Sequence, residues 1–335
     1  MKASDIIKVL SDERLSREPI MIWGPPGVGK SDVVETVAKG RDCPLWDVRL
    51  SLLDPTDLRG IPIPQGDRAL WLPPAFLPDR PGILFLDEIN AAPPLVQASA
   101  YQLILNRKIG EYVLPDGVQI VAAGNRRQDR AVTHRMPAPL RSRFQTHLNF
   151  EVDRDDWLRW AAGHGINADI QSFIQVEYGS ESANSRPDYP LFDFSATDAD
   201  ESFPCPRTWT FVNDLMKLPD SSVRHELIAG TIGAATAAGF RTYITTLRDL
   251  PSTDAVLVNG ETPELARTDM RYAYILRVAT AARPNQYPNV IRYANSLGAE
   301  FSVLMIKNMI ERDLEGMRIA DGFVDWAESH ADIML

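Results

Sequence analysis

The sequence predicts an α/β fold in which a parallel sheet is flanked by helices and followed by an all-α region. Three nearly continuous apolar runs, at residues 20–23, 83–86 and 118–123, are typical of strands that are buried on both faces of a parallel sheet. The first run leads through a glycine-rich turn into an amphipathic segment that begins near Lys30, which indicates a strand, a turn and a helix. Strand patterns become scarce after Asp153. An α/β domain that precedes a helical one accounts for this order of signals.

Local patterns predict the other elements of the α/β part. In chain order they are an amphipathic helix within 1–17, a strand at 45–50, a hairpin that turns at 65–67, a helix from Pro93 to Ile104, a hairpin over 108–117 that turns at 115–117, and a strand at 145–150. The hairpins are indicated by Gly, Asp and Pro between short apolar stretches. The paired prolines favour a helix start, because the first N–H groups of a helix have no partner within it.

The second half of the chain is expected to consist of helices joined by loops. The expected helices span 155–163, 167–178, 207–217, 222–238 and 262–282, and a further one carries the apolar stripe of Phe301, Leu304, Met305 and Met309. Thr262 fits the N-cap of its helix and Pro263 the first helical position. Residues 179–204 are rich in Ser, Asp and Pro and predict a long mobile loop that Phe192 and Phe194 would dock. The expected division of the chain is an α/β core at 1–152, helices and the loop at 153–204, and a helical region at 205–335.

Composition narrows the choice of partners and location. The 335-residue chain carries a formal net charge of −10, which disfavours nucleic acid as the main partner because such a chain lacks a broad basic surface. No apolar run approaches the ~20 residues that cross a bilayer, and the first residues do not show a basic stretch followed by an apolar one. A cytoplasmic protein without a membrane span is therefore expected. The two cysteines, Cys43 and Cys205, are too few for a disulfide framework or a zinc site and are expected to be buried.

The strongest local motif is the stretch G-P-P-G-V-G-K-S-D that begins at Gly24. Gly, four residues and then Gly-Lys-Ser is the pattern of a phosphate-binding loop, and the strand before it and the helix after it supply the expected context. Gly24, Gly27 and Gly29 permit backbone angles at which successive N–H groups converge on phosphate oxygens. Lys30 would place its ammonium on the β- and γ-phosphates, and the Ser31 hydroxyl would ligate Mg²⁺. The expected nucleotide-binding residues are Gly24, Pro25, Pro26, Gly27, Val28, Gly29, Lys30, Ser31 and Asp32.

Polar residues follow the later strands in a definite order. They are Asp87 and Glu88 after the run at 83–86, Asn125 after the run at 118–123, Arg141 and Arg143 before the last strand, and Arg207 at the start of a helix. The two adjacent carboxylates come at the carboxyl end of a predicted parallel strand, where ligands of open α/β sheets bind. The others each have an ordinary alternative, since Asn favours turns and Arg can cap a helix or lie in solvent. Together, and in this order, they favour a nucleotide hydrolase.

From about Glu18 to Asp214 the chain resembles the AAA+ ATPases, and most closely their MoxR-like branch. The matching stretches are residues 24–31, 57–60, 83–90, 121–125, 136–144 and 206–208. The resemblance implies a phosphate-loop NTPase sheet flanked by helices, with two β-hairpin insertions in an AAA+ core, followed by an all-α lid and C-terminal helices. It also implies hydrolysis of ATP with Mg²⁺ as cofactor, whereas the residues alone leave the base of the nucleotide open.

Roles in hydrolysis follow from this resemblance. Ser31 and Asp87 would hold Mg²⁺, the latter through water, and Glu88 would be the general base that orients and polarises the attacking water. Asn125 resembles the sensor whose amide reports on the γ-phosphate. These four residues and the phosphate loop would form one site at the edge of the sheet.

Three arginines would complete the site, and the first two of them would act between subunits. Arg143 resembles the arginine finger that reaches the γ-phosphate of a neighbouring subunit, and Arg141 is close enough to share or take this role. A finger supplied by a neighbour implies a ring, for which the family suggests six subunits. Arg207 resembles the second sensor on the helical lid. The two hairpins match family insertions, which makes Trp71 and Tyr112 candidates for gripping a partner, with packing onto their own hairpins as the equal alternative.

Three functions remain open on this basis. The first is an ATP-driven ring that remodels or activates a protein partner, which the resemblance suggests to contain a von Willebrand A-type domain. The second is a nucleic-acid motor or the motor subunit of a nuclease, for which hydrolysis stimulated by DNA with a steep salt dependence would speak. The third is a phosphate-loop kinase, which leaves Asn125, Arg143 and Arg207 unexplained as a set.

Overall fold

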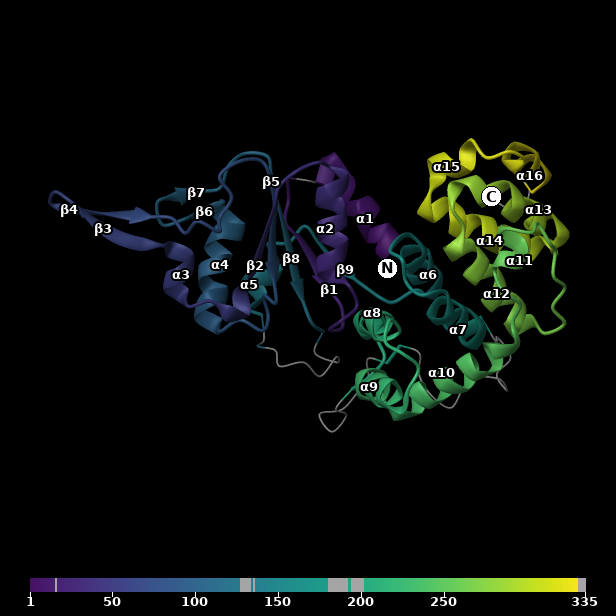
Figure 1. The fold of residues 1–335 in the computed structure, drawn as a ribbon. Helices are drawn as coiled ribbons and strands as arrows, with labels where there is room; N and C mark the ends of the chain where they lie inside the picture. Colours follow the sequence, from purple (N-terminus) through teal and green to yellow (C-terminus); the bar gives the residue numbers. More distant parts are fainter. Residues whose placement is uncertain (16, 127–133, 135, 180–191, 194–201, 331–335) are drawn as a thin grey trace. The chain divides into compact units, whose positions relative to one another are not determined.

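The structure is a computed structural model that describes residues 1–335 except 16, 127–133, 135, 180–191, 194–201 and 331–335 (Figure 1). The described chain divides into two units, Met1–Asp153 and Arg154–Leu335. All strands of the described residues lie in the first unit, and the second unit consists of helices and loops.

The first unit is built on a five-stranded parallel sheet. Its strands, in spatial order, are β2 (Leu45–Arg49), β5 (Gly82–Asp87), β8 (Val118–Gly124), β1 (Ile20–Trp23) and β9 (Thr146–Asn149). Every neighbouring pair runs parallel, and β5 and β8 are buried along their whole length. The predicted parallel sheet is confirmed. The strand order changes direction between β8 and β1, and ligands of such sheets bind at the carboxyl ends of the strands beside this point.

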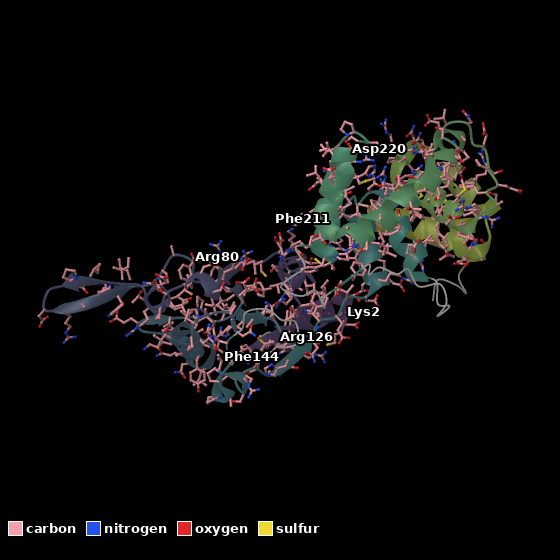
Figure 2. The ribbon with its side chains drawn as sticks, turned by 90° about the horizontal axis from the view of Figure 1, so that it is seen from below. Lys2, Arg80, Arg126, Phe144, Phe211 and Asp220 are labelled. Atoms are coloured by element: carbon pink, nitrogen blue, oxygen red, sulfur yellow. The ribbon has the colours of Figure 1, made fainter. Side chains whose placement is uncertain are left out.

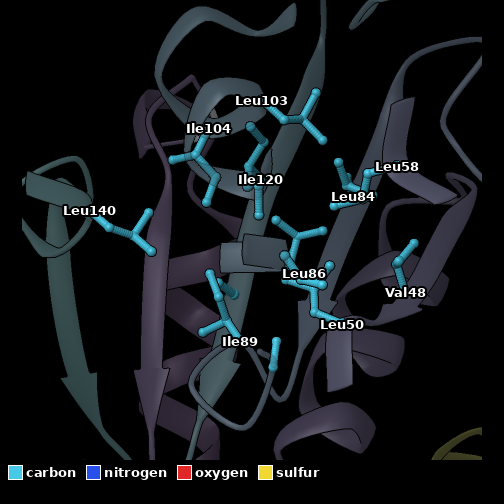
Figure 3. Packing of buried hydrophobic residues seen from close by; sticks show 14 of the residues in the cluster. Val48, Leu50, Leu58, Leu84, Leu86, Ile89, Leu103, Ile104, Ile120 and Leu140 are labelled. Carbon is cyan, nitrogen blue, oxygen red and sulfur yellow. The ribbon is translucent and has the colours of Figure 1, made fainter. Parts of the chain in front are cut away.

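Helices cover both faces of this sheet. α1 (Ala3–Ser11) and α2 (Lys30–Gly40) lie on one side, and α3 (Pro55–Arg59), α4 (Pro94–Asn106) and α5 (Ala138–Arg141) lie on the other (Figure 1). The core between α4 and the sheet contains the fully buried side chains of Leu84, Leu86, Leu103 and Ile120 (Figure 3). Burial of each such side chain stabilises the fold by about 1.5–3 kcal/mol. This packing holds the carboxyl ends of β5 and β8 side by side.

The first hairpin of this unit consists of β3 (Ile61–Gln65) and β4 (Arg68–Leu72). Its turn lies where the sequence predicts it. Gly60 is required at the base of the hairpin, because a Cβ there would lie only 1.9 Å from the carbonyl oxygen of Leu72 and the residue has a φ of 84°. The base of the hairpin is therefore closed by a direct backbone approach.

The second hairpin consists of β6 (Lys108–Ile109) and β7 (Tyr112–Val113). The turn predicted at 115–117 is wrong, because the chain reverses at Gly110, whose φ of 56° supplies the left-handed conformation of a tight turn. Gly117 has a φ of 80° but lies against Pro81 and leads into β8. Both places carry turn-forming residues, and the pairing of the two short strands decides between them.

The second unit is all-helical. Its helices are α6 (Arg154–Gly163), α7 (Ala168–Gly179), α8 (Pro206–Leu215), α9 (Ser222–Ile232), α10 (Ala234–Thr246), α11 (Asp254–Leu257), α12 (Thr268–Ala281), α13 (Tyr287–Ser296), α14 (Ala299–Arg312), α15 (Leu314–Arg318) and α16 (Phe323–Ser329). Phe173, Trp209 and Phe240 centre the apolar cluster of α6 to α10. A second cluster joins α11 to α16 and includes Met305 and Met309, so the stripe predicted on α14 belongs to the core.

Two helices of this unit differ from their predicted extents. One predicted helix is two, because Gly233, with a φ of 81°, ends α9 and precedes α10. The helix predicted to begin at Thr262 begins at Thr268 instead. Pro263 lies before it, where its carbonyl oxygen accepts a hydrogen bond from the hydroxyl of Tyr293 on α13 (3.2 Å). The stretch before α12 is therefore docked on α13 rather than wound into a helix.

Most of the long loop predicted at 179–204 lies outside the described residues, and so does Phe194. Phe192 is described, and its ring packs edge-on against Trp157 of α6 with 5.7 Å between the ring centroids. The docking expected of Phe192 is therefore confirmed. No helix within the described ranges is both long and apolar enough to cross a membrane.

Candidate functional site

The glycine-rich stretch forms a loop between the end of β1 and the start of α2. Gly24 extends the sheet by one residue, since its N–H donates to the carbonyl oxygen of Gly124 (3.2 Å). Gly27 and Gly29 have φ angles of 78° and 100°, in the region that favours glycine. Because α2 begins at Lys30, the first N–H groups of this helix and its positive dipole end face the loop. This arrangement is suited to binding phosphate.

The ammonium group of Lys30 lies inside this loop. Its Nζ donates to the carbonyl oxygens of Gly24 (2.8 Å) and Pro25 (2.9 Å) and to Oδ1 of Asn125 (2.9 Å). Because an ammonium group can only donate, the Asn125 amide presents its oxygen to Lys30 and keeps its NH₂ group for another partner. The loop after β1 and the residue after β8 thus meet at the Lys30 ammonium group.

Asp87 ends β5 next to the first turn of α2. Its side chain is only 7% exposed, and its carboxylate accepts a hydrogen bond from the Ser31 hydroxyl (3.3 Å). Burial raises the pKa of Asp87 and the Glu88 charge adds to this, whereas its hydrogen bonds and the Lys30 charge oppose the shift. A divalent cation would compensate this buried charge. A carboxylate and a hydroxyl fit Mg²⁺, which takes its remaining oxygens from water and phosphate, and the described residues contain no cluster of three or more metal-binding side chains.

Glu88 follows β5 in a strained backbone conformation. Its φ of 55° lies in the left-handed region, which costs a non-glycine residue about 1–3 kcal/mol, and its N–H donates to Oδ1 of Asp87 (2.8 Å). Its Oε2 accepts a hydrogen bond from the hydroxyl of Ser51, in the short 3-10 helix Leu50–Leu52 after β2. Asp47 on β2 adds further negative charge, and burial together with the Asp87 charge raises its pKa. Sequence reasoning missed Ser51 and Asp47, for which the only signal is their place on or just after the strand before β5.

Asn90 joins the ends of β5 and β8. Its Nδ2 donates to the carbonyl oxygen of Asn125 (2.7 Å), and its Oδ1 accepts a hydrogen bond from the Asn125 N–H (3.1 Å). This pair of bonds, the Asn90–Asn125 clamp, is enclosed, since Asn90 is only 3% exposed. Sequence reasoning included Asn90 in a matching stretch but gave it no role. A polar residue two positions after the paired acids of a buried strand is the signal that could have identified it.

Arg141 is the last residue of α5, and Arg143 follows it in the connection to β9; residues 141–143, the arginine segment, are exposed. The Nε and Nη2 of Arg143 each lie 3.4 Å from the hydroxyl of Tyr101, and its guanidinium is 5.9 Å from the centre of that ring. Phe144, the next residue, is labelled in the first unit in Figure 2. It is buried and packs in the core, which anchors the segment. The structure thus brings the two arginines together on the surface and directs Arg143 to Tyr101 of α4.

His147 connects the arginine segment to the end of β1. Trp23 Nε1 donates to Nδ1 of His147 (2.9 Å), and Nε2 of the same ring lies 3.0 Å from the carbonyl oxygen of Arg141. Since an indole N–H only donates, Nδ1 is the acceptor and Nε2 carries the proton that is donated to Arg141. Trp23 precedes Gly24, so the phosphate loop and the arginine segment share one imidazole. Sequence reasoning assigned His147 no role.

Arg207 lies in the second unit. It occupies the first turn of α8 and is exposed, after Pro206 at the first helical position. The Thr208 hydroxyl accepts a hydrogen bond from the Cys205 N–H (2.7 Å) and closes the start of this helix. Arg207 is therefore presented by a well-capped helix end. Cys205 is buried, as expected, whereas Cys43 is half-buried.

The two aromatic residues of the hairpins pack onto their own unit. The guanidinium of Arg59 lies 5.1 Å from the ring centre of Trp71, which is half-buried. The hydroxyl of Tyr112 donates to the carbonyl oxygen of Pro78 (2.6 Å), and its ring contacts the core. Neither contact lies within the residue's own hairpin, since Arg59 belongs to α3 and Pro78 precedes β5. Both rings therefore pack onto other parts of the first unit, and the gripping role stays a prediction.

The glycine loop, its lysine and the acidic end of the neighbouring strand define a phosphate-loop nucleotide-binding protein. Residues 19–144 match the family described as AAA domain (dynein-related subfamily). This stretch contains the loop, Asp87, Glu88, Asn125 and both arginines of the segment before β9. The first unit therefore contains an AAA domain, which supports the ATPase activity that the sequence predicts.

Several solved structures are similar to this chain at low sequence identity. A variant of RuvB from Thermotoga maritima is 17% identical, over 73% of this chain and 67% of that one, with a TM-score of 0.39. A candidate ATPase from Cytophaga hutchinsonii is 16% identical, over 98% of this chain and 88% of that one, with a TM-score of 0.37. NtrX from Brucella abortus is 15% identical, over 92% of this chain and 66% of that one, with a TM-score of 0.42. No curated protein matches the sequence.

Proposed function

We propose that this chain hydrolyses ATP with Mg²⁺ at the phosphate loop and works as a MoxR-like AAA+ ATPase, in a ring that remodels or activates a protein partner. The observation that carries the proposal is the position of the Lys30 ammonium, which is shared between the glycine loop and Asn125. The same loop meets Asp87 through Ser31. A phosphate group placed among these residues would therefore lie beside the carboxyl ends of three strands, β1, β8 and β5.

In the proposed reaction the loop amides and Lys30 hold the phosphates, and Glu88 accepts a proton from the attacking water. The water oxygen forms a bond to the γ-phosphorus while the bond from this phosphorus to the β–γ bridging oxygen breaks, which releases phosphate and ADP. When bound, Mg²⁺ neutralises charge on the β- and γ-oxygens, and Ser31 and Asp87 are the residues that would hold it. Ser51 occupies one oxygen of Glu88 and leaves the other to orient the water.

The arginines support assembly into a ring. Arg143 and Arg141 are exposed on the first unit, where a neighbouring copy can receive them. A guanidinium from the neighbour would stabilise the charge that develops on the transferred phosphate, with Arg143 as the finger and Arg141 beside it. Arg207 would act as a second sensor from the helical unit. Head-to-tail contacts of this kind close into rings, and six subunits is the number that we propose.

A protein is the partner that we propose, with a von Willebrand A-type domain as its recognition element. The formal net charge of −10 supports a protein partner over nucleic acid, because an acidic surface repels phosphate backbones. Hydrolysis that is stimulated by DNA would instead favour a nucleic-acid motor.

The test is to measure ATP binding and phosphate release separately. Glu88→Gln is expected to bind ATP like the wild type and to release phosphate about 10²–10⁴-fold more slowly, since it lacks the base. Lys30→Ala is expected to lose nucleotide binding as well. Glu35→Gln, on the exposed face of α2, is the control and should hydrolyse ATP normally. Wild-type turnover by Glu88→Gln would contradict the proposal.

A further inference from the structure

We propose that Asn90 is a positioning residue for hydrolysis, which holds the base Glu88 and the sensor Asn125 in one definite relation. The proposal rests on the function proposed above, from which the roles of Glu88 and Asn125 are taken. Asn90 is only 3% exposed and its side chain bonds to the backbone of Asn125, so it acts through other residues.

The Asn90–Asn125 clamp consists of two opposed hydrogen bonds. One side-chain amide donates to the carbonyl oxygen of Asn125 (2.7 Å) and accepts from its N–H (3.1 Å). A single hydrogen bond would allow the residue to pivot, whereas two opposed bonds orient the peptide groups on both sides of Asn125. The direction in which the Asn125 side chain leaves the backbone is thereby set, and that side chain meets Lys30 at 2.9 Å.

The clamp also restrains Glu88. Asn90 follows Glu88 by two residues, and Ile89 between them donates its N–H to the carbonyl oxygen of Ala123 (3.0 Å). The N–H of His134 donates to the carbonyl oxygen of Asn90 (2.6 Å). Glu88 itself has a φ of 55°, a conformation that persists only where the surroundings impose it. Asn90 supplies part of that restraint from the side opposite Ser51.

The clamp also requires space beside Gly124. A Cβ on Gly124 would lie 2.5 Å from Oδ1 of Asn90 and 2.9 Å from Cε of Met21, so only glycine leaves room for the amide. The φ of Gly124 is outside the left-handed region, so other residues could adopt its backbone conformation. Space rather than backbone conformation therefore explains this glycine. Gly124→Ala is then a way to displace the Asn90 amide without changing Asn125.

Single variants test the size of the effect. Asn90→Ala removes both bonds of the clamp, and kcat is expected to fall about 10²-fold, as for a displacement of about 1 Å in a catalytic site. Affinity for a non-hydrolysable ATP analogue should remain that of the wild type, because the phosphate loop is intact. Gly124→Ala should reproduce this pattern. Asn90→Asp has the same shape and keeps the acceptor but loses the donor, so it should be slow even if Asn90→Ala does not fold.

The double variant separates positioning from packing. In Asn90→Ala/Gly124→Ala the added methyl occupies space that the amide has vacated, so the melting temperature should recover from that of Gly124→Ala. If Asn90 acts by positioning, kcat stays as low as in Asn90→Ala, because the two bonds to Asn125 are still missing. Recovery of wild-type kcat in the double variant would show that Asn90 serves packing alone and would overturn the proposal.

Controls distinguish this proposal from the function on which it rests. Asn289→Ala removes a comparable bond, from Nδ2 to the Leu257 carbonyl oxygen (3.1 Å) in the second unit, and should lower stability but not kcat. Glu88→Gln and Asn125→Ala should both be slow. If these two variants hydrolyse ATP normally, the proposed function fails. If they are slow while Asn90→Ala and Asn90→Asp keep wild-type kcat, only the role of Asn90 is refuted.

Discussion

The hydroxyl of Ser51 donates a hydrogen bond to Oε2 of Glu88, so a residue that follows one strand holds the residue that follows the next. β2 and β5 are neighbours in the sheet, with Arg49 opposite Asp87, which brings together two side chains that are 37 residues apart in sequence. The proposed general base is therefore held by its own sheet before any nucleotide arrives.

Ser51→Ala is expected to lower kcat about tenfold, because loss of a hydrogen bond to a charged group is worth about 1.5 kcal/mol and leaves the Glu88 carboxylate free to turn. Affinity for ATP should not change. Steady-state phosphate release measures the effect, and Ser51→Thr, which keeps the hydroxyl, is the matched control. Equal rates in the Ala variant and the wild type would mean that Ser51 does not orient the base.

Asp87→Asn is expected to stabilise the protein in the absence of nucleotide and Mg²⁺. Folding raises the pKa of Asp87, chiefly by burial, so the ionised carboxylate destabilises the folded state. This loss of stability is absent below the pKa that Asp87 has in the unfolded chain. It develops as the pH rises through the higher pKa that Asp87 has in the folded protein. The gain in Tm over the wild type should therefore grow as the pH rises above about 4, the ordinary pKa of an unfolded aspartate. Asp116→Asn, at an exposed loop, is the control, and a lower Tm for Asp87→Asn at pH 7 would contradict the expectation.

Arg143→Ala is expected to reduce hydrolysis about 10³-fold if the arginine acts as a finger. Its own phosphate loop remains intact, so mixed assemblies with Lys30→Ala subunits should regain part of the activity, which phosphate release reports. Arg141→Ala in the same assay shows which arginine has the larger share. Mass measurement with a non-hydrolysable ATP analogue checks that a ring forms. Absence of rescue in mixed rings would place the action of Arg143 within its own subunit.

Tyr112→Phe is expected to lower the free energy of unfolding by about 1 kcal/mol, because it removes the hydrogen bond to the Pro78 carbonyl oxygen. The same enclosure raises the pKa of the Tyr112 hydroxyl to about 12. Basal hydrolysis should be unchanged, since the ring still fills its place beside the core. Chemical denaturation and phosphate release give the two quantities. Unchanged stability together with loss of activity toward a partner would revive the gripping role.

The site could be predicted from sequence where its residues are contiguous or follow a strong apolar run. The phosphate loop is read from one short stretch, and Asp87 and Glu88 follow a run that predicts a buried strand on its own. Ser51 and Asn90 could not be assigned in this way, because their partners lie 37 and 35 residues away and meet them only through the strand order of the sheet. The same limit applies to His147, whose partner Trp23 is 124 residues distant.

The helices and strands were predictable to the extent that their signals are local. β5 and β8 follow from apolar runs that only a doubly covered strand accommodates. The turn of the second hairpin could not be predicted, because Gly110 and the stretch at 115–117 both carry turn-forming residues. The pairing of β6 with β7 selects Gly110. The start of α12 could not be predicted either, because docking of Pro263 on Tyr293 outweighs a favourable helix-start pattern.

The imidazole between Trp23 and Arg141 makes two parts of the first unit depend on one side chain. It offers one lone pair and one N–H, which are the two groups that its neighbours require. A substitution at position 147 would therefore remove a hydrogen bond beside the phosphate loop and another in the arginine segment at the same time. One change outside the proposed nucleotide contacts would loosen both.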